Sequence, residues 1–150
     1  MRKGDTGITD LIDKRGVKKC APRVRALAHL DELSAALGYA RLKSKEKDLE
    51  KIQKFLISVC AVIAGGKADI KEAADFVEQK TAALEKKYKA PRVFLLPGKN
   101  GAETALHLAR AKCRTAETYL AGLKLDKNIP LFINRLSKYL FFLAVKHTIC

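Results

Sequence analysis

The sequence predicts an all-α protein, a single-domain bundle of five helices. Three observations carry this prediction: the length of 150 residues, the hydrophobic share of 48%, and long stretches in which apolar residues recur every three or four positions with only four prolines in the chain. A chain of this length suits one domain with one core. The hydrophobic share is too high for a chain that is disordered by its composition.

Five amphipathic segments follow one another with short connections, which is the pattern of a helical bundle. Residues 1–22 precede them and show no period, because glycines and Pro22 interrupt this part of the chain. We therefore divide the chain into an N-terminal part, residues 1–22, and a bundle, residues 23–150. The helices are expected at about 24–42, 44–64, 70–88, 102–123 and 131–150.

Each expected helix has an apolar stripe with spacings of three and four residues. The stripes are Leu30, Leu33 and Leu37 in the first helix; Leu49, Ile52, Leu56, Val59 and Ile63 in the second; Ile70, Ala73, Val77 and Leu84 in the third; Ala102, Leu106, Ala109, Cys113, Ala116 and Leu120 in the fourth; and Ile133, Leu136, Leu140 and Leu143 in the fifth. The second helix has the clearest ends, since Ser44 is a typical N-cap residue and Gly65 and Gly66 stop the helix.

The net charge of +14 favours polyanionic partners such as nucleic acid, phosphorylated ligands or an anionic membrane, although a solvated basic surface explains it equally well. The cysteines at positions 20, 60, 113 and 150 form no CxxC pair, which argues against a zinc knuckle. No secretory signal follows the basic start, and apolar runs such as 55–65 are too short to cross a bilayer. We therefore expect a cytoplasmic protein with reduced thiols.

The stretch LHLARAKCRTAE, residues 106–117, places His107, Arg110, Arg114 and Glu117 in one helical stripe about 80° wide. Two guanidinium groups spaced i, i+4 on one face can grip phosphate oxygens with paired hydrogen bonds. The alternative is a solvated salt-bridge ladder, because Arg114 and Glu117 have the i, i+3 spacing of an ion pair. No second histidine lies at the spacing of a metal ligand, so His107 is interpreted as a neighbour within the stripe.

The N-terminal stretch RKGDTGITDL has the composition of an anion-binding turn. Gly4 and Gly7 let backbone N–H groups approach an anion, and Thr6 and Thr9 offer hydroxyls to the anion or to a magnesium ion. A flexible terminal turn is the alternative interpretation. The stretch is not a Walker A motif, since GxxxxGK[ST] is absent from it.

Further candidates stand on single positions. Asp31 follows Leu30 near the inner face of the first helix, where a carboxylate needs a cation. The arginine stripe could supply this cation within the chain or across an oligomer. The alternative is an ordinary first-turn acid that is stabilised by the helix dipole. Phe94 lies in the loop before the fourth helix, where core filling is the default interpretation. Asn134 and Phe141 lie on one side of the fifth helix, off its core stripe, as site residues or as plain surface.

Together and in this order, these segments resemble the PduO-type ATP:cob(I)alamin adenosyltransferases. The motifs that carry the resemblance are KGDTGITDL at 3–11, VKKCAPR at 17–23, DELSAALG at 31–38, FLLPGK at 94–99, LHLARAKCRTAE at 106–117 and NRLSKYLF at 134–141. They cover nearly the whole chain, and the last two are specific to the family.

The resemblance implies a five-helix bundle of the cobalamin adenosyltransferase-like type that assembles as a homotrimer, with ATP bound between neighbouring subunits and its triphosphate wrapped by the N-terminal part. The ATP-binding residues that it implies are Gly4, Asp5, Thr6, Gly7, Thr9, Lys19, Arg110, Arg114, Glu117 and Asn134. The catalytic residues that it implies are Arg110, Arg114 and Asp31, with Asp31 pairing with Arg110 across the subunit contact. Phe94 and Phe141 match residues on the corrinoid side.

The implied reaction transfers the 5′-deoxyadenosyl group of ATP to the cobalt of cob(I)alamin, giving adenosylcobalamin and triphosphate. MgATP and cob(I)alamin would be the substrates, with magnesium carried by the nucleotide. A reductase and an adenosylcobalamin-dependent enzyme are the expected partners, with no nucleic acid and no membrane. One alternative is a diverged member of the family that binds ATP or a corrinoid without turnover, as a carrier or sensor. The other is a basic helical module that binds nucleic acid. The lack of a helix-turn-helix pattern argues against the second alternative.

Five positions depart from the family pattern: Lys3, His29, Lys99, Thr115 and Lys138. Lys138 replaces an aspartate on the side of Asn134 and Phe141, which reverses a charge near the implied site. The chain also ends at Cys150, soon after the fifth helix, where members of the family commonly continue. These departures bear on turnover more than on ATP binding.

Overall fold

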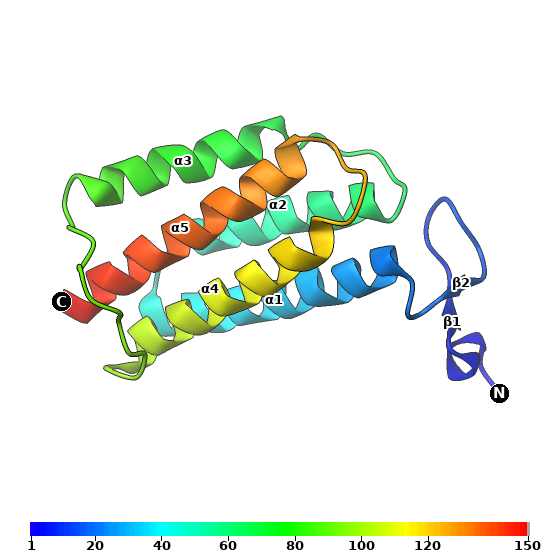
Figure 1. Ribbon diagram of the computed structural model, residues 1–150, viewed down its shortest axis with the longest axis horizontal. Coiled ribbons are helices and arrows are strands. Elements are labelled where there is room, and N and C mark those ends of the chain that lie inside the picture. The colour runs from blue at the N-terminus through cyan, green and yellow to red at the C-terminus, as the bar shows by residue number, and fades with distance from the viewer. Residues whose placement is uncertain (150) are drawn as a thin grey trace.

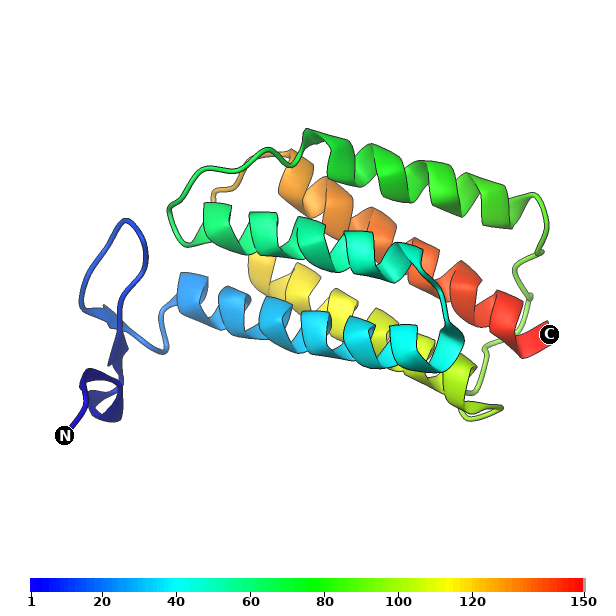
Figure 2. The ribbon, with the colours of Figure 1, turned by 180° about the vertical axis from the view of Figure 1, so that it is seen from behind.

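Five helices form the bundle in the computed structural model, which describes residues 1–149. They are α1 (Pro22–Ser44), α2 (Asp48–Ile63), α3 (Lys71–Glu85), α4 (Gly101–Leu120) and α5 (Asn128–Ile149). Figure 1 shows α4 beside α5 with α3 beyond them, and Figure 2 shows α1 and α2 on the other side. The all-α bundle predicted from the sequence is confirmed, and each helix begins and ends within a few residues of its expected bounds.

The predicted stripes build the core, except that Ala102 is only half-buried and Leu84 packs against the edge of the core. All five stripe residues of α2 are at most 2% exposed. α5 is buried around more of its circumference than its stripe predicts, because it packs against both α3 and α4; Phe132 and Tyr139 are therefore buried as well. Within the described part of the chain, no helix is long and apolar enough to span a membrane.

The predicted N-cap at Ser44 is wrong. Ser44 is the last residue of α1, and its hydroxyl donates to the carbonyl of Ala40 at 2.7 Å. The next residue, Lys45, adopts a left-handed conformation with φ of 62°. This residue ends α1 and turns the chain, so that α2 begins at Asp48.

The N-terminal segment, residues 1–21, is more regular than the sequence predicts. It contains a short 3-10 helix, η1 (Lys3–Thr6), and two antiparallel strands, β1 (Ile8–Thr9) and β2 (Val17–Lys18). The expectation of an irregular segment is wrong because backbone pairing, which leaves no hydrophobic period, orders this part of the chain. In Figure 1 the segment projects from the end of the bundle at which α1 begins.

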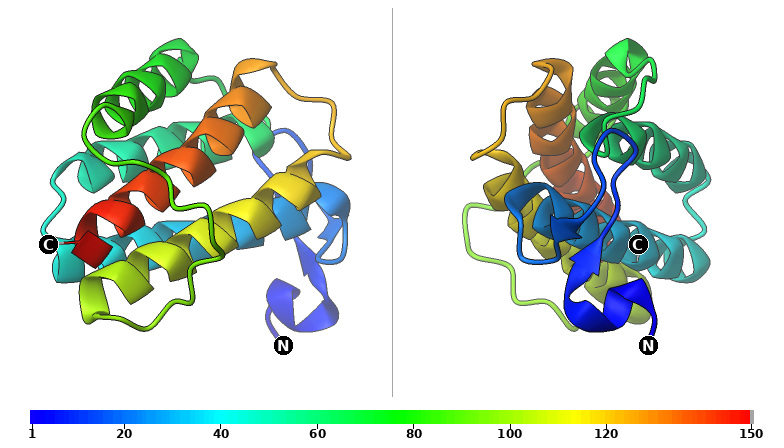
Figure 3. Two further views of the ribbon diagram at one scale, coloured as in Figure 1. Left: turned by 60° about the vertical axis from the view of Figure 1, so that its left-hand side comes forward. Right: turned by 90° about the vertical axis from the view of Figure 1, so that its right-hand side faces the viewer.

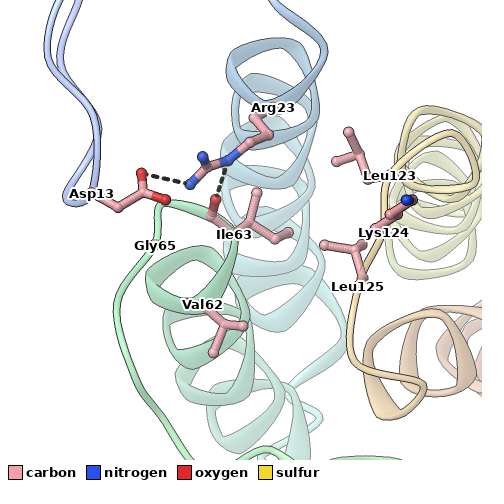
Figure 4. A pocket seen from close by; sticks show the side chains of 8 residues that line it. All are labelled: Asp13, Arg23, Val62, Ile63, Gly65, Leu123, Lys124 and Leu125. Carbon is pink, nitrogen blue, oxygen red and sulfur yellow. Dashed lines mark hydrogen bonds and ion pairs between the residues drawn. The ribbon is translucent and has the colours of Figure 1, made fainter.

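An anchor fixes the N-terminal segment to the bundle beside a cavity of 380 Å³ (Figure 4). Arg23, in the first turn of α1, donates from Nη2 to Oδ1 of Asp13 at 2.9 Å and from Nε to the carbonyl of Ile63 at 2.8 Å. The hydrogen bond from Arg23 keeps the pKa of Asp13 below its ordinary value. One arginine therefore joins the N-terminal segment, α1 and the end of α2.

Gly65 lets this anchor form. Its φ of +97° is a conformation that residues with a Cβ rarely adopt, and a Cβ at this position would lie 2.1 Å from Cγ of Asp13. The backbone N–H of Ile12 donates to the carbonyl of Ala64 at 2.9 Å, which holds the segment close to the turn. The close approach of Asp13 to the turn after α2 therefore requires glycine at position 65.

The connection from α3 to α4, residues 86–100, lies at the opposite end of the bundle from the N-terminal segment (Figures 1 and 3). Asn100 holds its last residues in place. The Asn100 side chain accepts from the N–H of Glu103 at 2.9 Å, as an N-cap of α4, and donates to the carbonyl of His147 at 2.7 Å. The start of α4 is thereby tied to the end of α5.

Candidate active site

A cavity of 280 Å³ opens between α4 and α5 at the stripe singled out from the sequence. Its walls are Arg110, Arg114, Ser137, Lys138 and Phe141. The two arginines come from successive turns of α4, and the other three residues come from α5. Three cations and no carboxylate of residues 1–149 line this cavity, so it attracts an anion. We call it the arginine cavity.

Neither arginine of this cavity is paired with an acid. Among the described residues Arg110 and Arg114 make no ion pair, and the ladder between Arg114 and Glu117 does not form. By contrast, Arg135 on another face of α5 pairs with Glu78 at 3.1 Å. The solvated-ladder interpretation is therefore wrong, and both guanidinium groups remain available for phosphate oxygens.

A second cavity, of 130 Å³, adjoins the arginine cavity and shares Arg110 and Phe141 with it. Its other walls are Val93, Phe94 and Leu95 from the α3–α4 connection and His107 from α4. The Phe94 side chain is 97% exposed, so the default interpretation that it fills the core is wrong. An exposed phenylalanine at a cavity offers an apolar surface to a ligand. We call this second cavity the phenylalanine cavity.

Glu103 and His107 lie buried on α4 behind the phenylalanine cavity, with exposed fractions of 1% and 3%. Oε2 of Glu103 accepts from the backbone N–H groups of Gly98 and Lys99, each at 3.1 Å, and Oε1 lies 3.3 Å from Nε2 of His107. His107 is a neighbour of Arg110, as predicted from the stripe, but its side chain is buried. The ring is turned inward, one helical turn from the Glu103 carboxylate, and receives the Nε donor of Arg110 at 3.3 Å.

The charge states of this buried pair follow from its surroundings. Burial lowers the pKa of His107, and the charge of Arg110 adds to this effect against the opposing charge of Glu103. Burial raises the pKa of Glu103, but the N–H groups of Gly98 and Lys99 outweigh it, so that the net shift is downward. Near pH 7 the pair is a neutral imidazole beside a carboxylate. Because Nδ1 accepts from Arg110, the ring proton is assigned to Nε2, on the side of Glu103.

The remaining predicted residues of α4 and α5 extend the same surface. The two helices run antiparallel (Figure 1). Glu117 comes after Arg114 on α4, and Asn134 comes before Lys138 on α5. Both residues are therefore displaced from the cavity in the same direction along the bundle. Neither Glu117 nor Asn134 lines the arginine cavity, but both continue from it toward the end that carries the N-terminal segment. The predicted residues of α4 and α5 thus extend from the arginine cavity toward the N-terminal segment, whereas Phe94 borders the neighbouring cavity.

The predicted N-terminal residues gather with one another rather than at either cavity. Lys19 donates from Nζ to the carbonyl of Gly4 and from its backbone N–H to the carbonyl of Gly7, each at 2.8 Å. Asp5 accepts the backbone N–H of Arg2 at 2.7 Å, which closes η1. The predicted set Gly4, Asp5, Thr6, Gly7 and Thr9 lies in η1, β1 and the turn between them, beside Lys19. None of these residues lines the arginine cavity.

Asp31 is exposed on α1, so its predicted place near the inner face of the helix is wrong. Burial, with a smaller effect from the charge of Asp31, raises the pKa of Cys60 on α2. Within residues 1–149 Asp31 makes no ion pair, and a pair with Arg110 inside one chain is not formed.

The sequence profile of cobalamin adenosyltransferases matches residues 1–147. The chain belongs to the cobalamin adenosyltransferase family. It is 33% identical to the corrinoid adenosyltransferase MMAB of Mus musculus, over 94% of this chain and 68% of the mouse protein. It is also 33% identical to the corrinoid adenosyltransferase PduO of Salmonella typhimurium, over 95% of this chain but only 47%, about half, of that relative.

Solved structures of the family share the fold. A variant of the PduO-type ATP:corrinoid adenosyltransferase from Lactobacillus reuteri, complexed with cobalamin and ATP, matches with a TM-score of 0.88 and 28% identity, over 98% of this chain and 91% of that one. A second variant of the same protein, complexed with ATP, matches with a TM-score of 0.85. These relatives support the five-helix bundle as the cobalamin adenosyltransferase fold.

Two departures from the cobalamin adenosyltransferase pattern have a structural explanation. Lys99 stands where the family has glycine, yet Glu103 uses only the backbone N–H of Lys99. Lys138 stands where the family has aspartate, and its Nζ lies 2.8 Å from Oε1 of Glu85 on α3. The charge of Lys138 is therefore balanced within the chain.

Sequence reasoning missed the roles of Glu103, Arg23 and Gly65. Glu103 stands three residues after Asn100 and four before His107, and the first spacing is a helix-start pattern that could have singled it out. Arg23 and Gly65 come from distant parts of the chain, so no local pattern announced their contact with Asp13.

Proposed function

We propose that this chain transfers the 5′-deoxyadenosyl group of ATP to the cobalt of cob(I)alamin, giving adenosylcobalamin and triphosphate. The observation that carries the proposal is the junction of the two cavities: unpaired arginines line one, the exposed Phe94 borders the other, and Arg110 and Phe141 belong to both. An anionic nucleotide and an apolar corrinoid face would meet there. Similarity to corrinoid adenosyltransferases along nearly the whole chain favours a transferase over a binding-only member.

The reaction requires no nucleophile or general base from the protein. Cobalt(I) donates an electron pair to the 5′-carbon of ATP and becomes cobalt(III), while the carbon–oxygen bond breaks and triphosphate leaves with the bonding electrons. The protein has to hold the 5′-carbon against cobalt and to stabilise the departing charge. Arg110 and Arg114 supply guanidinium groups for the triphosphate, and Phe94 and Phe141 form an apolar wall that keeps water and an axial ligand from the lower corrinoid face.

The complete ATP site lies between two copies of the chain in a homotrimer. The residues that wrap the triphosphate, from Gly4 to Thr9 with Lys19, do not line the arginine cavity of their own chain. A neighbouring copy therefore has to bring them to Arg110 and Arg114. Asp31, which is exposed and makes no ion pair within the described residues, would pair with Arg110 of that neighbour.

Magnesium would arrive with the triphosphate. No group of three His, Cys, Asp or Glu side chains in residues 1–149 is placed to hold a metal ion. Bound to ATP, the ion would neutralise part of the phosphate charge, with the hydroxyls of Thr6 and Thr9 near it. The reductase, the adenosylcobalamin-dependent partner enzyme and the cytoplasmic location remain predictions.

An anaerobic turnover assay tests the proposal. Purified protein, MgATP and chemically reduced cob(I)alamin are mixed, and adenosylcobalamin is followed by its absorbance and its loss on exposure to light. We expect product above a protein-free control. ATP binding without product would instead support the diverged carrier or sensor, and salt-sensitive DNA binding without ATP binding would support the nucleic-acid module.

Replacing Asp31 with alanine should weaken the trimer. Removing one partner of an ion pair that assembly buries costs about 2–5 kcal/mol, so the concentration for half-assembly should rise at least about tenfold. Sedimentation equilibrium measures it. Asp75→Ala is the control, because Asp75 pairs with Arg135 inside one chain. Intact assembly together with intact ATP binding in Asp31→Ala would contradict the intersubunit pair.

Lys138→Ala should leave the KM for ATP within about threefold of the wild type, because an exposed ion pair such as that with Glu85 contributes only about 0–1 kcal/mol. Steady-state kinetics at saturating corrinoid measure the change. Lys51→Ala is the control, since Lys51 pairs with Glu72 at the same distance of 2.8 Å. A tenfold rise in Lys138→Ala alone would show that Lys138 grips the triphosphate instead.

A further inference from the structure

A series of polar contacts runs beneath the phenylalanine cavity, from the loop that carries Phe94 to Arg110. The N–H groups of Gly98 and Lys99 donate to Oε2 of Glu103 at 3.1 Å each. Oε1 of Glu103 lies 3.3 Å from Nε2 of His107, and Nδ1 of His107 accepts from Nε of Arg110 at 3.3 Å. The link therefore connects a wall of the corrinoid side with a cation of the nucleotide side.

Burying this pair is costly, because a carboxylate and an imidazole lose their water. The neighbouring positions on the inner face of α4 are apolar, as at Leu106 and Ala109, and an apolar pair at 103 and 107 would complete the stripe. The loop is shaped to meet the carboxylate: Gly98 has φ of +122°, a conformation that favours glycine, and two successive N–H groups converge on one oxygen. The buried pair therefore holds the loop in place rather than adding to the stability of the core.

The link is incompletely formed at one point. Nε2 of His107 lies close to Glu103, but among the described residues it is the one buried side-chain nitrogen or oxygen without an aligned hydrogen bond. A small rotation of the ring or a small shift of the loop would align the bond. The position of the loop and the orientation of Arg110 therefore depend on each other through His107.

We propose that Glu103 and His107 form a positioning unit that couples the loop of residues 94–99 to Arg110. When a corrinoid seats the loop, Glu103 holds the imidazole, and the imidazole holds the Arg110 guanidinium toward the triphosphate. Both residues act through other groups and not on the reacting atoms. This inference rests on the proposed function and adds a link between its two substrate sites.

Two substitutions of His107 separate the two halves of the link. Asparagine places its Oδ1 where Nδ1 lies, so His107→Asn keeps the acceptor for Arg110 and loses the contact with Glu103. Glutamine places its amide where Nε2 lies, so His107→Gln keeps the donor to Glu103 and loses the acceptor for Arg110. We expect His107→Gln to raise the dissociation constant for ATP about tenfold, as loss of a hydrogen bond to a charged group would, with little change in the KM for corrinoid. We expect the opposite split for His107→Asn.

A double-mutant cycle on ATP affinity decides whether His107 acts through Arg110. In calorimetry without corrinoid, Arg110→Ala and Arg110→Ala with His107→Gln should bind ATP within about twofold of each other. In an Arg114→Ala background, His107→Gln should still raise the dissociation constant for ATP about tenfold. The link would be overturned if His107→Gln still weakened ATP binding about tenfold in the Arg110→Ala background. It would also be overturned if both His107 variants shifted the KM for ATP and the KM for corrinoid equally.

Two further controls keep the test decisive. Glu103→Gln has the same shape as the wild type and keeps an oxygen for the loop N–H groups, so it replaces the His107 variants if these do not fold. It should raise the KM for corrinoid and leave the dissociation constant for ATP within about threefold of the wild type. The calorimetric cycle needs no turnover. An inactive wild type would therefore contradict the proposed function alone, whereas an active wild type with an uncoupled cycle would contradict the positioning unit alone.

Discussion

Arg114→Ala is expected to raise the KM for ATP by about ten- to a hundredfold and to leave the KM for corrinoid within about twofold. The Arg114 guanidinium faces the arginine cavity and makes no ion pair with an acid of residues 1–149, so its hydrogen-bonding capacity is available to phosphate. A charge-assisted hydrogen bond to such a group is worth about 1.5–3 kcal/mol, and each 1.4 kcal/mol changes an affinity tenfold. Steady-state kinetics with varied MgATP at saturating corrinoid measure the effect.

The matched control for this variant is Arg135→Ala. Arg135 lies on α5, where it pairs with Asp75 and Glu78 of α3 and lines neither cavity. Its loss removes one partly exposed ion-pair network, worth about 1 kcal/mol of folding free energy, and should leave the KM for ATP unchanged. Equal effects of the two substitutions would mean that the general positive charge, rather than the arginine cavity, attracts the nucleotide.

Gly65→Ala is expected to weaken ATP binding at least about tenfold with an intact bundle. The new Cβ would lie 2.1 Å from Cγ of Asp13, and alanine would have to adopt a φ of +97°. Strain at such a φ and overpacking each cost about 1–3 kcal/mol. The chain would relieve both by releasing Asp13 and the N-terminal segment, so the residues proposed to wrap the triphosphate would lose their support. Calorimetry with MgATP and the midpoint of thermal unfolding measure the two consequences.

Two variants show whether the overlap with Asp13 is the cause. Gly122→Ala adds the same methyl group where no atom lies within 4 Å, and ATP binding should be unaffected. Asp13→Ala removes the carboxylate that Arg23 holds, so it should weaken ATP binding to a similar degree, and combining it with Gly65→Ala should add little further loss. Unchanged ATP affinity in Gly65→Ala would show that the anchor does not position the N-terminal segment for ATP binding.

The helical periodicity was sufficient to predict the bundle, because a stripe with spacings of three and four residues can only be buried by packing against other helices. It also predicted that Arg110 and Arg114 share one face, since residues four apart on a helix are neighbours whatever surrounds them. His107 shows where this reasoning stops. It lies at the edge of the same stripe, and the rotation of α4 about its axis, which depends on its contacts with α1 and α5, turned the ring inward to Glu103.

Phe94 and Asp31 show the same limit for residues outside the core. The apolar character of Phe94 alone favours core filling, and only the family motif points to the corrinoid side. The path of the α3–α4 connection leaves Phe94 97% exposed beside a cavity. Asp31 was placed near the inner face by its neighbour Leu30, whereas the side chain points outward. A single residue has no period, so only the tertiary path of the chain decides whether it is buried.

The sequence by itself determined the five helices, through spacings of a few residues along each helix, and the family, through its motifs. The set of ATP and corrinoid residues that those motifs imply stays a prediction. The tertiary structure decided how the set is divided: Arg110, Arg114, Phe94 and Phe141 meet at two adjoining cavities, and the residues from Gly4 to Lys19 gather in a separate anchored segment. The physical reason is that such contacts join distant parts of the chain. Their geometry is set by how whole helices pack, and no local spacing records it.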